Sequence, residues 1–445
     1  MTEAQSTIDI ARAIDERPMG ALQIGVIALC AVIAFLDGLD TQSIAIAAPL
    51  LAETMGLSRA ALGPALSAGL LGAMIGALTF GPLGDRFGRK RLLVVAAVTF
   101  GVFTLLTAYP AGYYGLLAIR FLAGIGLGGA TPCFIALASE YAPTRRRAMV
   151  TSLAWAAFPI GGSLGALMNA FLASHYGWQS IFVVGGVLAL IAAIALVAWL
   201  PESIRYLLAN GGDRATIGRI ASRMLPEIPA GAAFQVHDER IASTPVRQLF
   251  SEGRGPGTLL LWVPFMTAFG TLAISALWTP TLMREYGYQL SQIGVVVSLS
   301  GIGAIVGMAS AGRLMEAVGP KVVLIPSLLF GALSMAALGF ATGSVALLTT
   351  VLVSVALFVG IGASGSLALA SLVYPTAIRS TGVGWAIGMG RFGQVITPLV
   401  MGLIVARQWS TASIFLTFAI APAAGALAVL FLRWDSAKSE TAAPR

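Results

Sequence analysis

Charged residues are scarce in this sequence, and histidine and cysteine are almost absent. Only 10% of its 445 residues are Asp, Glu, Lys or Arg, whereas 57% are hydrophobic and the mean hydropathy is +0.87. This composition excludes a soluble globular protein and a disordered chain. The two cysteines, Cys30 and Cys133, lie in apolar segments and exclude a disulfide framework. The two histidines, His175 and His237, lie outside the apolar segments, so we do not expect a histidine proton relay.

Signatures of enzyme chemistry are also missing. The sequence contains no phosphate-binding loop, no metal-ligand cluster and no arrangement of nucleophile, base and acid. We therefore expect no ATP hydrolysis, no zinc chemistry and no enzyme activity. We also predict that the protein uses no cofactor.

Long apolar runs dominate what the sequence does contain. A helix needs about 20 residues to cross roughly 30 Å of hydrocarbon, and twelve runs reach that length. They cover 21–50, 60–83, 91–110, 113–139, 148–174, 178–200, 257–283, 290–312, 321–341, 344–373, 380–406 and 410–433. The runs are continuous rather than alternating, and they contain closely spaced glycines such as Gly72/Gly76 and Gly124/Gly128. We therefore predict an all-α membrane protein with twelve transmembrane helices that pack closely.

A polar stretch in the middle of the sequence divides the spans into two sets of six. We predict a cytoplasmic N-terminal segment at 1–20, a first six-helix bundle at 21–200, a cytoplasmic linker at 201–255, a second bundle at 256–433 and a cytoplasmic tail at 434–445. The linker carries several arginines and acids, and we expect some amphipathic helix within it.

The net charge of +8 is not distributed as in a nucleic-acid-binding protein. Nearly all Lys and Arg residues fall in segments on the same side as the two termini. The exceptions are Arg59, Arg284 and Arg407 on the other side, and Arg120 and Arg391 inside the spans. This asymmetry follows the positive-inside rule, so we expect both termini in the cytoplasm, a lipid bilayer around the protein and no nucleic acid as partner.

The two halves of the sequence contain related segments. GPLGDRFGRKR, around Asp85, is echoed by GRLMEAVGPK, around Glu316. EYAPTRRRA, which contains Arg147, is echoed by VYPTAIRST, which contains Arg379. Both pairs are separated by nearly the same number of residues, which indicates a duplicated six-helix unit.

Two motifs and several longer stretches resemble a known family. GPLGDRFGRK matches the loop signature G-x-x-x-D-R-x-G-R-K of the major facilitator superfamily. RFLAGIGLG, which begins at Arg120, matches the fourth-helix pattern R-x-x-x-G-x-G-x-G of the same superfamily. DGLD, RFLAGIGLGGATP, SEYAPTRRRA and YPTAIRSTGVGWAIGMGRFG look like its aromatic acid:proton symporter branch.

The resemblance implies two pseudo-symmetric six-helix bundles, the major facilitator fold, working by alternating access in a membrane of the bacterial inner-membrane type. It also implies a protein similar to transporters of 4-hydroxybenzoate, protocatechuate or benzoate, whose partners are protons and a small aromatic carboxylate. One chain of this architecture contains a complete pathway, so we expect it to function as a monomer.

Asp37 and Asp40, in DGLD, are the candidates for proton coupling. They lie inside the first apolar run, at a spacing that places both side chains on one helix face. A carboxylate in hydrocarbon costs roughly 2.5 kcal/mol or more, so an acidic pair there indicates a functional site. Arg120 stays charged and needs a carboxylate or water as partner, so we predict that it faces Asp37 or Asp40 and modulates it. The alternative is a fixed structural ion pair.

Arg391, in GMGRFG, is the candidate for binding a substrate carboxylate. It is the only charged residue deep in the second half, and its planar guanidinium matches a carboxylate in two parallel hydrogen bonds. We add Gln394 and Asp40 to this substrate site; a helix-packing or gating ion pair is the alternative for Arg391. Aromatic candidates for a stacking wall are Trp155, Phe158, Phe265, Phe269, Trp278 and Trp385. When each ring is taken singly, core or lipid packing explains it better than ligand contact does.

Charged residues at the cytoplasmic helix ends are candidates for a gate. Acids and bases there can hold the bundles together in one state and separate in the other. The candidates are Asp85, Arg86, Arg89, Glu140, Arg147, Glu316 and Arg379. The alternative is that the bases only set the membrane topology, which we favour for Arg145 and Arg146.

These observations predict proton-coupled import of an aromatic carboxylate, with two alternatives open. A drug:proton antiporter of the same superfamily would carry a fifth helix patterned with glycine and proline, which FPIGGSLG at 158–165 approximates weakly. A membrane sensor would bind aromatic acids and signal through 201–255 without moving solute.

Overall fold

The computed structural model describes residues 7–9, 14–209, 213–224, 233–235, 246–251, 253–341, 343–374 and 376–433. Within these residues, twelve helices are long and apolar enough to cross a membrane, which confirms the predicted number of spans. They are α2 (Ala21–Met55), α3 (Arg59–Phe87), α4 (Arg89–Thr107), α5 (Gly112–Glu140), α6 (Arg147–Tyr176), α7 (Gln179–Trp199), α10 (Gly255–Glu285), α11 (Leu290–Val318), α12 (Pro320–Leu338), α13 (Val345–Val373), α14 (Thr376–Ala406) and α15 (Thr411–Phe431).

The remaining elements are short. The predicted linker contains α8 (Ile204–Ala209), α9 (Arg214–Met224) and η2 (Val246–Leu249), and η1 (Thr144–Arg146) precedes α6. β1 (Thr7–Asp9) pairs in parallel with β2 (Ala233–Gln235), so the described residues include two three-residue strands that the all-α prediction lacked. This pairing joins the N-terminal segment to the linker.

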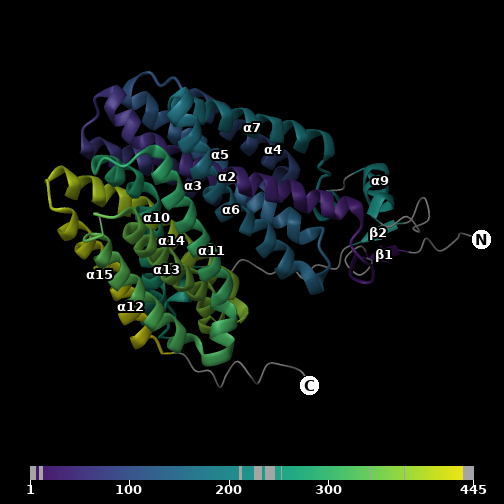
Figure 1. Cartoon of the computed structure of the whole chain (residues 1–445). Helices are drawn as coiled ribbons and strands as arrows, with labels where there is room; N and C mark the ends of the chain where they lie inside the picture. The colour runs from purple at the N-terminus through teal and green to yellow at the C-terminus, as the bar shows by residue number, and fades with distance from the viewer. Residues whose placement is uncertain are drawn as a thin grey trace, which may run out of the picture.

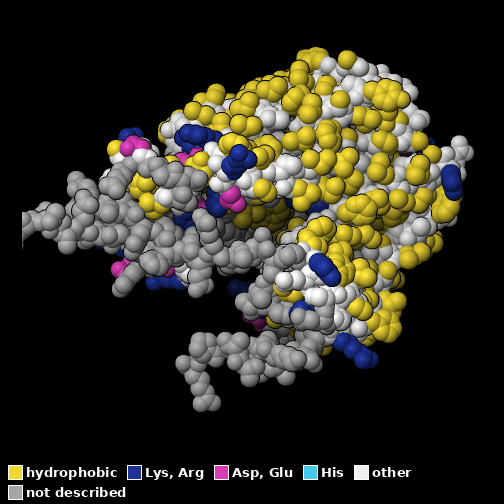
Figure 2. Space-filling view, turned by 180° about the vertical axis from the view of Figure 1, so that it is seen from behind, with side chains coloured by type: hydrophobic (Ala, Val, Ile, Leu, Met, Phe, Trp, Pro, Cys, Tyr) yellow, Lys and Arg dark blue, Asp and Glu magenta, His cyan; other side chains and the backbone are white. Residues whose placement is uncertain are grey.

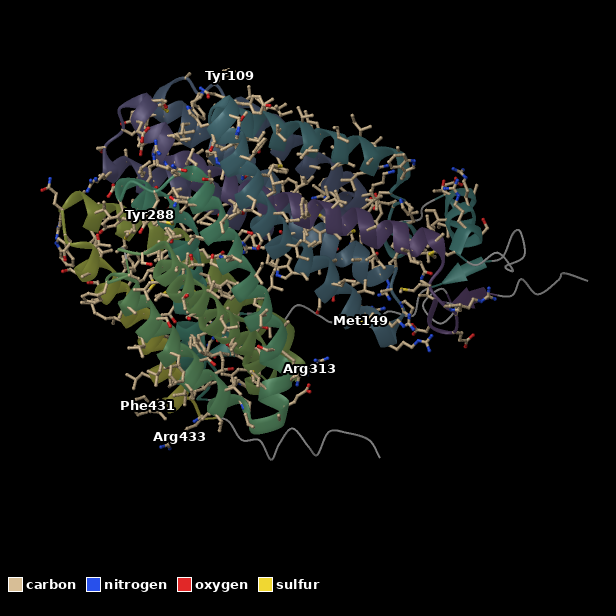
Figure 3. The ribbon with its side chains drawn as sticks, in the orientation of Figure 1. Tyr109, Met149, Tyr288, Arg313, Phe431 and Arg433 are labelled. Atoms are coloured by element: carbon tan, nitrogen blue, oxygen red, sulfur yellow. The ribbon has the colours of Figure 1, made fainter. Side chains whose placement is uncertain are left out.

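The helices form two bundles that meet at one end and diverge at the other (Figure 1). Helices α2–α7 make the first bundle and α10–α15 the second. Tyr109 and Tyr288 mark the end where the bundles meet, the closed end, whereas Met149 and Arg313 belong to the diverging end (Figure 3). Charged side chains gather mainly at the diverging end, and hydrophobic side chains cover the outer faces (Figure 2). This distribution fits a protein surrounded by lipid.

Glycines allow helix backbones to touch inside each bundle. Gly72 and Gly76 of α3 lie against the backbone of α5, and Gly124 and Gly128 of α5 lie against α3, so closely that no Cβ would fit. Gly307 of α11 lies in the same way against α13. The predicted close packing is therefore present in the first bundle and recurs between the corresponding helices of the second.

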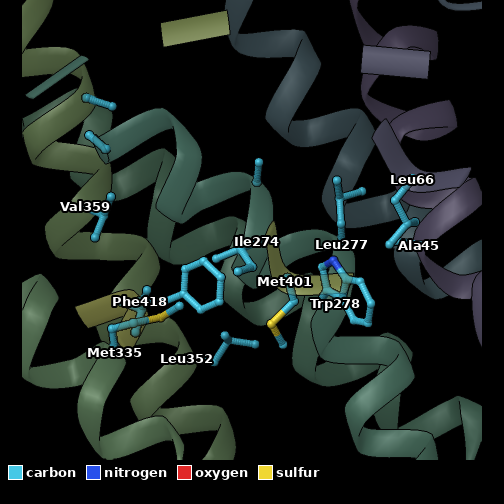
Figure 4. Packing of buried hydrophobic residues seen from close by; sticks show 14 of the residues in the cluster. Ala45, Leu66, Ile274, Leu277, Trp278, Met335, Leu352, Val359, Met401 and Phe418 are labelled. Carbon is cyan, nitrogen blue, oxygen red and sulfur yellow. The ribbon is translucent and has the colours of Figure 1, made fainter. Parts of the chain in front are cut away.

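Apolar side chains and small residues seal the closed end. A hydrophobic cluster that includes Trp278 and Leu277 of the second bundle extends to Ala45 and Leu66 of the first (Figure 4). Helix α3 of the first bundle also contacts α14 of the second bundle. A Cβ on Gly402 of α14 would lie 2.9 Å from the Cα of Gly63 on α3. The Ser67 hydroxyl also donates to the Val395 carbonyl at 3.0 Å. Water has little room at this end.

The acidic motif DGLD lies where α2 and α6 make their closest contact. A Cβ on Gly38 would overlap the carbonyl oxygen of Phe158 and lie 2.8 Å from the amide nitrogen of Gly162. From the other side, a Cβ on Gly165 would lie 2.9 Å from the Cα of Leu39. FPIGGSLG therefore forms the surface on which DGLD packs, and Gly38 is required between the two aspartates because α6 leaves no space there.

We expect Gly38→Ala to destabilise the protein by about 1–3 kcal/mol, because the added Cβ forces α2 and α6 apart. Gly25→Ala on the same helix is the matched control, since no atom lies within 4 Å of a Cβ built at Gly25. The control should be neutral or stabilising by up to about 1 kcal/mol. Thermal unfolding of both purified variants in detergent measures the difference. Equal midpoints would contradict the close contact.

Candidate functional site

Asp40 forms a buried ion pair with Arg120 inside the first bundle. Arg120 Nη2 lies 2.9 Å from Asp40 Oδ2, and Nη1 lies 3.2 Å from Oδ1. The Thr104 hydroxyl donates to Oδ1 at 3.2 Å, and the Phe182 ring centroid lies 5.8 Å from the guanidinium carbon. The Asp40 side chain is 0% exposed and that of Arg120 is 3% exposed. Such a pair is bidentate and shielded from solvent, so its hydrogen bonds are strong.

This geometry bears on both roles predicted for Asp40, proton coupling and substrate binding. Arg120 does lie beside the acidic motif, with Asp40 as its partner, in the arrangement of a fixed structural ion pair. Both carboxylate oxygens are occupied, and the side chain is enclosed by α2, α4 and α5. Asp40 is therefore not positioned to contact substrate in this structure, contrary to the expectation that it belongs to the substrate site.

Asp37, one turn earlier on α2, points to the interface between the bundles. Its side chain is half-buried, and its charge interacts with that of Arg391 on α14 of the second bundle. No ion pair or hydrogen bond between described residues engages its carboxylate. We expected Asp37, Asp40 and Arg391 to converge on one chamber, but the sequence could not show which of the two acids interacts with Arg391. The structure thus brings the predicted proton site and the predicted anion site together across the interface.

Among the described residues, Arg391 has one hydrogen-bond partner, which is neutral. Its Nη1 donates to Oε1 of Gln394 at 3.3 Å, and both side chains are half-buried. The glycines of GMGRFG fix its position, because Gly393 lies against the backbone of α10 at Met266 and a Cβ on Gly390 would lie 2.9 Å from the ring of Phe269. A guanidinium with five donors and a single amide acceptor retains capacity for an anion.

The aromatic candidates divide into two groups. Trp155 and Phe158 of α6 are half-buried and stacked, with ring centroids 5.7 Å apart and planes 8° apart. Phe269 is half-buried beside Gly390 and stacks on Phe265 at 6.3 Å. These rings lie on α6 and α10, next to the helices that carry Asp37 and Arg391.

Three other aromatic candidates lie elsewhere. Phe265 is fully buried, so it supports Phe269 from behind and cannot form the wall itself. Trp278 is 1% exposed and belongs to the hydrophobic cluster at the closed end. Trp385 is 45% exposed and stacks on Trp262 at 6.1 Å, nearly two helical turns from Arg391. Sequence position alone could not separate these rings because all of them occur near the middle of a span.

Two polar residues near the acidic motif were missed by the sequence analysis. Gln42 on α2 has a buried Oε1 without a hydrogen-bond partner among the described residues, and its side chain lies near Gly162. Asn169 on α6 is fully buried and donates to the Ser43 hydroxyl at 3.1 Å. Amides inside apolar runs were the available signal, since a buried polar group needs a partner. Gln42 is therefore a candidate acceptor for a ligand.

At the diverging end, several predicted gate residues form a cluster within the first bundle. Arg89 lies 3.0 Å from Asp85 and also pairs with Glu140. The Ser203 hydroxyl donates to Glu140, and Glu202 accepts from the Lys90 amide at 2.8 Å. Glu202 and Ser203, which were not predicted, connect the start of the linker to α4 and α5.

The other gate candidates make local contacts or remain exposed. Arg147 donates to the Ser139 carbonyl at 3.0 Å, and Arg379 donates to the Tyr374 carbonyl at 3.3 Å. Arg86 lies 5.3 Å from the Phe87 ring centroid, and Glu316 is exposed. No ion pair between described residues joins the two bundles at this end.

At the closed end, two ion pairs do join the bundles. Arg59 at the start of α3 lies 3.1 Å from Glu285, and Glu53 at the end of α2 lies 3.4 Å from Arg284. The sequence analysis treated Arg59 and Arg284 only as exceptions to the charge asymmetry. Their pairing could not be recognised because charges at helix ends are common and the partners are more than two hundred residues apart in the sequence.

Comparisons with known proteins show which family and fold this chain resembles. Residues 30–289 and 260–444 match the family model described as the Major Facilitator Superfamily. A 4-hydroxybenzoate transporter, PcaK, of Pseudomonas putida is 36% identical over 95% of this chain and 96% of its own length. A gallate transporter of Pseudomonas putida is 36% identical over 95% and 94%, and a 3-(3-hydroxy-phenyl)propionate transporter of Escherichia coli is 35% identical over 91% and 93%. The xylose transporter XylE of E. coli, solved in an inward open conformation, matches with a TM-score of 0.75 at 21% identity, covering 94% of this chain and 98% of XylE.

We expect Arg120→Leu alone to destabilise the protein by about 3–5 kcal/mol, because it leaves the Asp40 carboxylate buried without its partner. The double variant Asp40→Leu/Arg120→Leu should be clearly more stable than Arg120→Leu, since it removes both charges. Thermal unfolding of the two single variants and the double variant in detergent gives the coupling energy. Additive losses would show that the pair is not coupled as the geometry requires.

Proposed function

This chain belongs to the Major Facilitator Superfamily, and from that premise we propose that it imports an aromatic carboxylate together with protons by alternating access. It is a transporter and not an enzyme, as its relatives are. The proposal is supported by the electrostatic interaction between Asp37 on α2 of the first bundle and Arg391 on α14 of the second bundle. An anion site and a proton site on different bundles couple the movement of the bundles to both ligands.

Arg391 would bind the substrate carboxylate. Its guanidinium is half-buried and has only the Gln394 amide oxygen as a hydrogen-bond partner among the described residues. An arginine in this setting gains most from a carboxylate that accepts two parallel hydrogen bonds. The named relatives carry 4-hydroxybenzoate, gallate and 3-(3-hydroxy-phenyl)propionate, which all combine a carboxylate with a hydroxylated aromatic ring.

The aromatic ring of the substrate would lie between α6 and α10. Trp155 and Phe158 offer a stacked pair on one side, and Phe269 offers a ring beside Arg391 on the other. Aromatic contacts of this kind contribute roughly 0.5–1.5 kcal/mol beyond area burial. The unpartnered Oε1 of Gln42 is an acceptor for a ring hydroxyl.

Asp37 would carry the coupled proton. When it is charged, it offsets part of the positive charge of Arg391 and repels the substrate carboxylate, so anion binding is weakened. When it is protonated, both effects vanish, so substrate and proton favour each other's binding. This sign favours symport of an anion over antiport, in which proton and substrate compete. A sensor through the linker would need no such pairing between the bundles.

The two ends of the molecule would act as alternating gates. The ion pairs of Arg59 with Glu285 and of Glu53 with Arg284, together with the small-residue contacts of α3 and α14, support a state closed on one side of the membrane. The Asp85–Arg89–Glu140 cluster would change its partners when the diverging end closes. We propose that this end, with both termini, faces the cytoplasm of a bacterial inner membrane and that one chain suffices for transport.

Purified protein in proteoliposomes should accumulate radiolabelled 4-hydroxybenzoate when an inward proton gradient is imposed, and much less without the gradient. Arg391→Lys should raise the half-saturation concentration at least about ten-fold, because an ammonium cannot form the bidentate contact. Arg407→Lys, at an exposed position just after α14, is the matched control and should leave uptake unchanged. Absence of any uptake of aromatic acids would overturn the transport proposal, and unchanged affinity in Arg391→Lys would overturn the substrate site.

Asp37→Asn should abolish gradient-driven accumulation while substrate binding persists, because the amide imitates the protonated acid and cannot release a proton. Exchange of labelled for unlabelled substrate across the proteoliposome membrane should therefore continue. Asp37→Glu retains a titratable carboxyl and should preserve part of the accumulation. Gradient-driven accumulation at the wild-type level in Asp37→Asn would assign coupling to another residue.

A further inference from the structure

A cavity lies between the first bundle and the linker. It has a volume of about 670 Å³ and is bounded by the start of α4, the end of α7 and helix α9. Its walls include Lys90 and Arg91 from α4 and Arg219 and Arg223 from α9. Nothing in transport chemistry requires a basic cavity at this position.

The sequence of α9 explains why it presents arginines to the cavity. Ile217, Ile220 and Met224 recur at helical spacing and are buried in the hydrophobic cluster of the first bundle. Arg219 and Arg223, one turn apart, are exposed on another side of the helix. The apolar face fixes α9 against the bundle and thereby fixes the arginines at the cavity.

The two acids in the cavity wall, one of which also interacts electrostatically with Arg219, offset only part of the charge of the four bases. Glu202 accepts from the amides of Lys90 at 2.8 Å and Ser203 at 3.0 Å. Asp213 caps the start of α9, and the hydrogen bond from the Ala215 amide is the main cause of a pKa of Asp213 below its usual value. Both carboxylates are thus engaged with backbone groups.

Three guanidinium groups are left without an ion-pair partner among the described residues. They belong to Arg91, Arg219 and Arg223, and all three side chains are exposed. Lys90 donates to the Val197 carbonyl at 3.0 Å. Four bases and two acids line the cavity, so its net charge is positive. An anion with several oxygens can accept hydrogen bonds from more than one of these guanidinium groups.

The apolar part of the wall indicates where this anion comes from. Trp199, the last residue of α7, is 73% exposed at the cavity, and Leu22 lies in the first turn of α2. Tryptophan at the end of a span is typical of the level at which lipid headgroups meet hydrocarbon. The cavity therefore joins a basic region to an apolar edge at the membrane surface.

We propose that this cavity binds the phosphate headgroup of an anionic phospholipid from the cytoplasmic leaflet. The proposal rests on the membrane orientation given under the proposed function, and basic pockets on that side of membrane proteins are suited to such headgroups. The phosphate contacts Arg219, Arg223 and Arg91, and the acyl chains leave past Trp199 and Leu22. Bound in this way, the lipid holds α9 to the first bundle.

The test uses the full chain in detergent, titrated with phosphatidylglycerol or phosphatidylcholine and followed by native mass spectrometry. Wild-type protein should retain phosphatidylglycerol at least ten-fold more tightly than phosphatidylcholine. Arg219→Gln/Arg223→Gln should lose most of that preference, and Arg219→Lys/Arg223→Lys should recover it to within a few-fold. Arg145→Gln/Arg146→Gln removes the same charge from exposed positions elsewhere at this end and should behave as wild type.

Each outcome decides the proposal separately from transport. Undiminished preference for phosphatidylglycerol in Arg219→Gln/Arg223→Gln would overturn it, and so would an equal loss in Arg145→Gln/Arg146→Gln. Displacement of the lipid by millimolar inorganic phosphate would assign the cavity to a soluble phosphate compound instead. Thermal unfolding of the same detergent preparations shows whether each variant is folded, and uptake of 4-hydroxybenzoate is measured separately in proteoliposomes, so failure of lipid binding and failure of transport are distinguishable.

Discussion

The arrangement of the two bundles depends on one pair of opposite charges, a carboxylate on the first bundle and a guanidinium on the second. Asp37 and Arg391 lie within membrane spans and interact electrostatically, yet no ion pair within the described residues joins them. A charge in hydrocarbon needs water, a counter-charge or a proton. A ligand that brings a carboxylate to Arg391 and a proton to Asp37 satisfies both groups at once. In the proposed mechanism, the binding free energy of this ligand and proton differs between the two bundle arrangements, because a ligand shifts a conformational equilibrium only through such a difference.

The same motif assigns its second acid a different part. Asp40 lies one turn beyond Asp37, and the helix turn places it inside the first bundle instead of at the interface. There the bidentate contact with Arg120 and the Thr104 hydroxyl enclose it completely. A sealed ion pair keeps α2 and α5 together while the bundles move. Gly38 between the two acids allows α6 to lie directly on α2, so the whole motif is held at one depth.

The sequence predicted the number of spans, the close glycine packing and the residues that form both charge pairs, because hydrophobic length, small-residue spacing and the cost of buried charge are local properties. It did not predict which acid pairs with Arg120 and which interacts with Arg391, because both depend on helix rotation and on contacts between distant segments. Aromatic residues were equally ambiguous: Phe269 lies at the interface and Phe265, one turn away, lies in the core. Glu53 and Glu285 were missed because exposed charges at helix ends carry no such cost.

The contacts between the bundles at the closed end differ in strength, and their strength determines how much free energy is needed to open this end. The pairs Arg59–Glu285 and Glu53–Arg284 are between 31% and 57% exposed, so each contributes only about 0–1 kcal/mol. The contact of Gly63 with Gly402 buries little side chain, because neither residue has one. Separating this end therefore breaks weak ion pairs and backbone contacts, and it also exposes the part of the hydrophobic cluster that spans the two bundles. In the proposed alternating-access mechanism, the ligand must supply this free energy through a difference in its affinity for the two arrangements of the bundles.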